Sequence, residues 1–137
     1  MASPTEAPQH LGTTQAAISN AIVGLLHEYT GRGPTKARTT IATDLVVCVL
    51  ADTLTKGEHS LVADGKSDLV LRTRKAFQDT MRNDIIAAVE RLTERKVIAF
   101  MSDNHIDPDF AVETLILEAL PKDETAPTAP DHKAPTV

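Results

Sequence analysis

Two stretches of the chain place apolar residues at the three- and four-residue spacing of an amphipathic helix. The first predicts a helix from Thr14, a candidate cap, to Gly31, which should end it. The second predicts a long helix from Ser67, again a candidate cap, to about Arg95. The first apolar stripe consists of Ile18, Ile22, Leu25, Leu26 and Tyr29. The second consists of Val70, Phe77, Met81, Ile85, Ala88, Val89 and Leu92, with Arg74 on the same face between Val70 and Phe77.

Four runs rich in β-branched and apolar residues predict strands. Residues 36–42 and 45–51 are joined by a tight turn, and the second of these runs is apolar on both faces. Residues 97–101 and 110–117 form a second pair of strands. The polar residues 102–109 between them have the composition of a loop. Each pair therefore predicts a β-hairpin.

A short helix is predicted between the two hairpins. Thr55 is its candidate cap, and Glu58 stands three residues later as the reciprocal partner of a capping box. Asp64 and Gly65 break this helix before the long one begins. The order helix-strand-strand-helix-helix-strand-strand predicts an α+β fold, in which the two β-hairpins form one four-stranded antiparallel sheet with helices packed on one face.

The second face of this sheet is also expected to carry apolar side chains. Along residues 110–118, Phe110 and Val112 point to one side of the strand, while Ala111 and Leu115 point to the other. A large apolar surface left in water is unfavourable. We therefore expect a homo-oligomer, most simply a dimer, that buries the second face.

The composition limits the class of protein. A chain of 137 residues with 42% hydrophobic residues predicts one domain, at residues 13–120, between a flexible tail at 1–12 and a disordered Pro/Ala/Thr-rich tail at 121–137. The net charge of -5 argues against nucleic-acid binding. Because no apolar run reaches the roughly 20 residues of a membrane span and no signal peptide is present, we expect a cytoplasmic protein without direct membrane insertion. Cys48 lies within an apolar run and is expected in the core.

Residues 31–38, here called the 31–38 segment, combine two glycines, a proline and three cations. They form either a helix C-cap followed by a turn or a nest of backbone amides that attracts an anion. The segment lacks the spacing of a Walker motif and of a Rossmann fingerprint, so no nucleotide cofactor is predicted. The candidate anion- or partner-binding residues are Gly31, Arg32, Gly33, Lys36 and Arg38.

The long helix contributes two further candidates, Arg72 and Arg74. Arg74 interrupts the apolar stripe, where a charge needs an ion pair, a route to solvent or a role in a site. The histidines are too scattered for a metal motif, and the acidic residues within 102–109 fit a turn better than a calcium loop. We therefore expect neither a metal nor a cofactor.

Together these motifs resemble a small bacterial family called DUF2294 or MpsC, named after a Na⁺-translocating membrane-potential-generating system. The resemblance covers about residues 15–118 and is carried by Gly-x-Gly-Pro at 31–34 and Leu-Thr-x-x-Glu at 54–58. It implies a soluble accessory or regulatory component rather than a pore. The chain departs from the family at Glu94, where a Thr-Gly-Arg sequence often has glycine. The matching positions are Gly31, Gly33, Pro34, Arg38, Thr55, Glu58, Arg72 and Arg74.

Three interpretations of function remain open. The first is a non-enzymatic module linked to a membrane ion or inorganic-carbon transport system, which binds a membrane transport protein or another partner, or a small anion, near the 31–38 segment. The second is an enzyme acting on a phosphorylated or carboxylated metabolite, with Glu58 as acid/base and Arg38 and Arg74 holding the anion. The third is a structural oligomer without a ligand.

Overall fold

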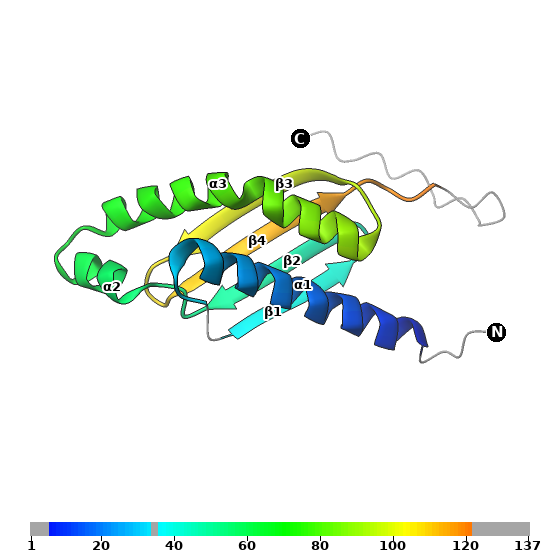
Figure 1. Cartoon of the computed structure of the whole chain (residues 1–137), viewed down its shortest axis with the longest axis horizontal. Coiled ribbons are helices and arrows are strands. Elements are labelled where there is room, and N and C mark those ends of the chain that lie inside the picture. The colour runs from blue at the N-terminus through cyan, green and yellow to red at the C-terminus, as the bar shows by residue number, and fades with distance from the viewer. Residues whose placement is uncertain (1–5, 34–35, 122–137) are drawn as a thin grey trace, which may run out of the picture.

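The computed structural model describes residues 6–33 and 36–121, which form helices over one face of a single sheet (Figure 1). Helix α1 and helix α3 both lie over this face, and α2 lies near the end of the sheet where the chain leaves β2. In chain order the elements are α1 (Glu6–Thr30), β1 (Lys36–Ala42), β2 (Leu45–Ala51), α2 (Lys56–Ala63), α3 (Ser67–Thr93), β3 (Val97–His105) and β4 (Phe110–Leu117).

The sheet has the strand order β1-β2-β4-β3, and every neighbouring pair is antiparallel. The two hairpins, β1–β2 and β3–β4, therefore meet through their second strands, which occupy the centre of the sheet. Both central strands are rich in aliphatic residues, as expected of strands that have neighbours on both edges. The predicted α+β fold and order of elements are confirmed.

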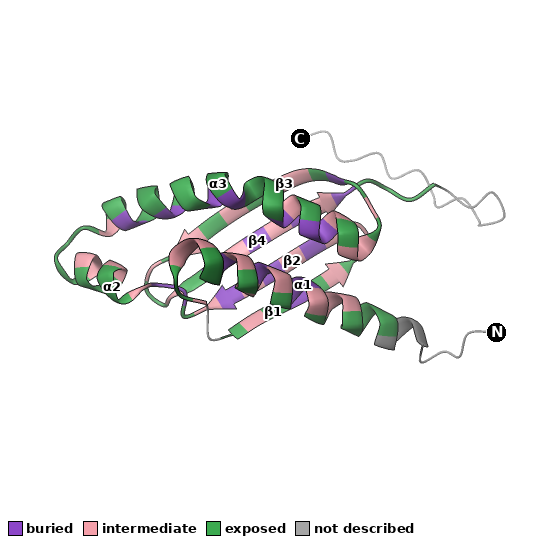
Figure 2. Ribbon diagram, in the orientation of Figure 1, coloured by how far each residue is buried: buried purple, intermediate pink, exposed green. Residues whose placement is uncertain are grey.

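The hydrophobic core lies between the sheet and the two long helices (Figure 2). Each fully buried Leu or Ile side chain in such a core contributes roughly 1.5–3 kcal/mol to the free energy of unfolding. Cys48 belongs to this core, as predicted. The largest fully buried apolar side chains are Ile18 and Ile22 of α1, Met81 and Ile85 of α3, Leu50 of β2, and Leu115 and Leu117 of β4.

The helix starts differ from those predicted. Helix α1 begins at Glu6, so residues 6–12 of the predicted tail are helical. Thr14 lies inside the helix, where its hydroxyl donates a hydrogen bond to the carbonyl of His10, and it is not a cap. Lys66, rather than Ser67, is the N-cap of α3, and it makes no side-chain capping bond. The predicted end of α1 is correct, because Gly31 follows its last residue with φ +77°.

Strand β3 is longer than predicted and continues to His105, which pairs with Phe110. The predicted loop 102–109 is therefore wrong for its first half. β3 is an edge strand, so side chains such as that of Asp103 are exposed to water and can be polar. Residues 102–105 therefore have the composition of a loop, although their backbone pairs with β4.

The second face of the sheet carries none of the described helices. We call it the open face. It consists of the alternate residues of each strand, beginning with Lys36 in β1, Leu45 in β2, Ala99 in β3 and Phe110 in β4. Its residues on β2 are all partly exposed, whereas the intervening residues on β2 are buried under the helices. The prediction that both faces of the sheet carry apolar side chains is therefore correct.

Candidate functional site

The 31–38 segment begins as a helix C-cap. The amide of Gly31 donates a hydrogen bond of 2.9 Å to the carbonyl of His27, and the positive φ of Gly31 turns the chain away from the helix axis. The guanidinium of Arg32 donates to the backbone carbonyl of Asp52 at 3.3 Å and lies 4.0 Å from the Asp52 carboxylate. Pro34 lies outside the described residues. The first half of the segment thus fastens α1 to the end of β2.

The second half of the segment contains the start of strand β1. Lys36 and Arg38 are exposed residues of β1 and belong to the open face, whereas Thr39 between Arg38 and Thr40 is buried under the helices. Among the described residues, Arg38 makes no ion pair. Its side chain is exposed at the β1 edge of the sheet.

Arg74 and Glu58 form a partly buried ion pair between α3 and α2. The Nε and Nη2 atoms of Arg74 donate to the two carboxylate oxygens of Glu58 at 2.7 and 2.6 Å, and Nη2 also donates to the carbonyl of Thr53. Glu58 simultaneously closes the predicted capping box with Thr55. Burial acts to raise the pKa of Glu58, but the hydrogen bonds from Arg74 and Thr55 outweigh it and hold this pKa below its ordinary value.

Asp109, in the turn before β4, ties down the same connector between β2 and α2. Its carboxylate accepts hydrogen bonds from the hydroxyl of Thr53 at 2.9 Å and from the amide of Leu54 at 2.8 Å. Its carbonyl accepts from the amide of Asp52 at 3.1 Å. Arg32, Arg74 and Asp109 therefore converge on three consecutive residues of the connector, Asp52, Thr53 and Leu54. This convergence stabilises the fold and leaves their charges engaged.

The candidate cations do not come together in one pocket. Arg38 lies on the open face, while Arg74 is 5% exposed and lies among the helices on the other side of the sheet. Arg72, two residues earlier on α3, is exposed. The structural ion pair considered for Arg74 is present, and both oxygens of Glu58 are already bonded. An acid/base role for Glu58 would require this pair to break first.

A buried carboxyl group lies in a polar row that crosses the covered face of the sheet. The register places Thr39, Cys48, Glu113 and Ser102 side by side on the four strands. The hydroxyl of Ser102 donates to Glu113, and Ser19 of α1 is hydrogen-bonded to Thr39 at 2.7 Å. Glu113 is 1% exposed, and burial raises its pKa to about 7 although the Ser102 bond lowers it.

Sequence reasoning did not single out Glu113 as a titrating group. The available signal was its position among inward-facing apolar residues of β4, where a carboxylate needs either a cation or a proton. Burial likewise raises the pKa of the neighbouring Cys48 thiol, so Cys48 has the character of an inert core residue.

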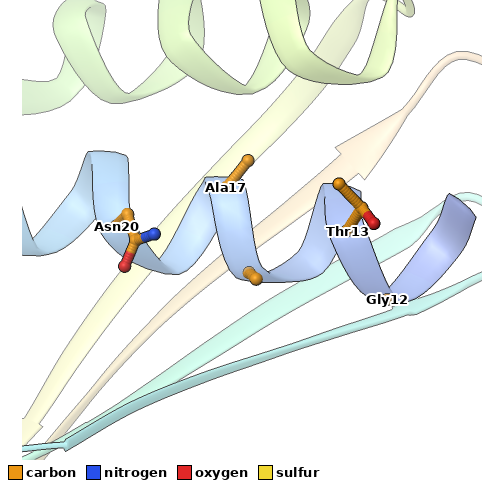
Figure 3. Close-up of a pocket in the computed structure, with 5 residues that line it drawn as sticks. Gly12, Thr13, Ala17 and Asn20 are labelled. Atoms are coloured by element: carbon orange, nitrogen blue, oxygen red, sulfur yellow. The ribbon is translucent and has the colours of Figure 1, made fainter. Parts of the chain in front are cut away.

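The hollow along α1 offers little ligand chemistry. It has a volume of about 750 Å³ and is lined by Gly12, Thr13, Ala16, Ala17 and Asn20. Figure 3 shows that the labelled residues come from successive turns of one helix and carry short side chains. Within residues 6–33 and 36–121, no group of three or more histidine, cysteine or acidic side chains is placed to hold a metal ion.

The open face combines an apolar centre with opposite charges at its two edges. The register aligns Arg38 of β1, Val49 of β2, Val112 of β4 and Asp103 of β3 in one row across the sheet. Val49 and Val112 are partly exposed, and the two charged residues at the ends of the row are exposed. A further hollow of about 170 Å³ lies beside Asp103. An apolar surface bordered by charge is the arrangement expected of a protein interface.

In the described part of the chain, the helices are too short or too polar to cross a membrane. No curated protein and no solved structure matches the chain significantly. A family model described as "Na+-translocating membrane potential-generating system (MpsC)" matches residues 10–119. This match covers more than half of the sequence and includes the described elements from α1 to β4. The chain therefore belongs to the MpsC family.

Proposed function

We propose that the chain is a cytoplasmic, non-enzymatic accessory or regulatory module of a membrane ion or inorganic-carbon transport system, and that it acts by binding protein at the open face. The observation that carries this proposal is the apolar centre of that face, which no described helix covers. The family description, which names a Na⁺-translocating system, supports the link to ion transport.

The position of the 31–38 segment supports the same surface. Lys36 and Arg38, two of its three cations, stand at the β1 edge of the open face. The cations of this segment and the apolar residues of the sheet then belong to a single binding surface. Cations at the rim of an interface guide association and select partners of opposite charge.

The engagement of Glu58 favours the non-enzymatic interpretation over the metabolite-processing one. A general base must reach the proton that it removes, and both Glu58 oxygens face Arg74. A pKa held below the ordinary value also makes Glu58 a weaker base. The arginines of the second hypothesis, Arg38 and Arg74, lie on opposite sides of the sheet.

Site-specific photo-crosslinking in cells tests this proposal. A photoreactive residue at Val49, in the centre of the open face, should give covalent adducts with protein. The matched control is the same residue at Arg72, which is exposed on α3 away from the open face. Mass spectrometry should identify the adducts from Val49 as this chain itself or as a component of an ion or inorganic-carbon transport system. Adducts from Arg72 but none from Val49 would overturn the proposal.

A further inference from the structure

We propose that the occupant of the open face is a second copy of this chain, related to the first by a twofold axis that runs parallel to the strands. This inference rests on the proposed function, because it names the partner of the surface described there. The contact that defines this dimer joins Arg38, at the β1 edge of one chain, to Asp103, at the β3 edge of the other.

The open face carries opposite charges at its two edges, so it is complementary to a second copy of itself. Arg38 and Lys36 make the β1 edge positive. Asp103 makes the β3 edge negative, and its only described hydrogen bond is the local one to the amide of Asn104. Between the two edges, the row contains only the valines of β2 and β4. A surface that is positive at one edge and negative at the other pairs with itself when the edges are exchanged.

Only one orientation of the twofold axis makes this exchange. When two sheets pack face to face, about 10 Å apart, an axis parallel to the strands lays β1 of one chain over β3 of the other and keeps each cross-sheet row in register. Arg38 then faces the partner's Asp103. An axis perpendicular to the strands would lay β1 over β1 and reverse the rows. If it passed through the centre of the sheet, Arg38 would face the partner's Thr40 instead.

The hollow beside Asp103 gives the guanidinium a place to enter. It has a volume of about 170 Å³ and lies between β2 and β3, over β4. Its open-face lining consists of Val49, Val112, Phe110, His105 and Asp103. Apolar walls suit the methylene stem of an arginine, and a carboxylate suits its charged end. The twofold axis creates this contact twice in each dimer.

Two charge reversals test the geometry. In an Arg38→Asp dimer, carboxylates would face each other at both contacts, and in an Asp103→Arg dimer two guanidinium groups would do so. Each variant alone should therefore dissociate at concentrations where the wild type is a dimer, with a Kd weakened by at least about tenfold. An equimolar mixture of the two variants should form heterodimers, because both contacts then regain opposite charges. Native mass spectrometry of the mixture reports their composition directly.

Arg72→Asp is the matched control and should leave the dimer intact, and far-UV circular dichroism should show that all variants are folded. A monomeric wild type at about 100 μM would overturn the inference, because a dimer with a Kd of about 1 μM is almost fully assembled at this concentration. Single variants that dimerise like the wild type, or a mixture without preferential heterodimers, would overturn it as well. The proposed function would survive these results if Val49 still crosslinked to a different protein.

Discussion

Two carboxyl groups on the covered side of the sheet have pKa values shifted in opposite directions. Glu58 has a cationic partner, since Arg74 bonds to both of its oxygens, and its pKa is lowered. Among the described residues, Glu113 has only the hydroxyl of Ser102 as a hydrogen-bond partner. This bond does not offset the loss of hydration, and the pKa of Glu113 rises to about 7. The chemistry of each carboxyl group therefore depends on the side chain that the fold places against it.

The raised pKa of Glu113 predicts a stability that falls as the pH rises. The folded state prefers the protonated carboxyl, so this contribution is complete below the ordinary pKa of 4.5 and is lost as the pH passes through about 7. At about 1.4 kcal/mol per pKa unit, the loss is on the order of 3 kcal/mol. Glu113→Gln should remove it.

Urea unfolding of both proteins between pH 4.5 and 8.5 measures this effect. The unfolding free energy of Glu113→Gln minus that of the wild type should increase as the pH rises and should level off above about pH 8. Glu94→Gln makes the same change at an exposed carboxylate and is the matched control. A difference that does not depend on pH would show that Glu113 stays charged in the folded protein.

Removal of Arg74 should destabilise the fold strongly. Arg74→Leu would leave the Glu58 carboxylate, whose side chain is 14% exposed, without its cation, and would free the carbonyl of Thr53. The expected cost is about 3 kcal/mol in the free energy of unfolding. Arg72→Leu makes the same change at an exposed position of the same helix and should cost less than about 0.5 kcal/mol. Equal costs for the two variants in urea unfolding would contradict a structural role for the ion pair.

Among the elements, three of the four strands were easier to predict than the far half of β3 and the start of α1. The strands β1, β2 and β4 begin and end where the sequence pattern predicts, because their runs of apolar and β-branched residues are bounded by turn residues. The far half of β3 was missed because exposed residues of an edge strand can be polar, so nothing in their composition separates them from a loop. The start of α1 was missed because Pro8 and Gly12 are typical of a tail.

The exit from α3 is strained at one residue. Glu94 adopts a left-handed conformation with φ +56°, and its amide bonds to the carbonyl of Glu90. A side chain in this region costs roughly 1–2 kcal/mol, and glycine avoids this cost. The sequence resemblance already marked Glu94 as a position where the family often has glycine, and the backbone explains why glycine suits it.

Glu94→Gly should therefore raise the free energy of unfolding by about 1 kcal/mol. Glu94→Ala also removes the carboxylate but keeps a Cβ atom, so it should give little or none of this gain. Thermal unfolding of the two variants beside the wild type separates the backbone effect from the effect of charge. An equal gain from alanine would assign the effect to charge.

At the scale of the whole molecule, the sequence predicted a sheet with helices on one face and an apolar second face. It did not predict which candidate residues meet. Pairing of Arg74 with Glu58 depends on how α2 packs against α3, and the burial of Glu113 depends on the cross-strand register. Local patterns contain neither relation. The same register aligns Arg38 and Asp103 in one row of the open face. The dimer that we propose takes its geometry from this row.

The molar mass in solution, measured by light scattering over a range of concentrations, tests most directly whether the open face is an interface between two copies. We expect twice the 14.7 kDa of one chain for the wild type and for Arg72→Glu. We expect the mass of one chain for Val49→Glu, which places a charge in the apolar centre of that face. A wild type with the mass of one chain throughout, or a Val49→Glu variant that keeps twice this mass, would show that the open face is not the dimer interface.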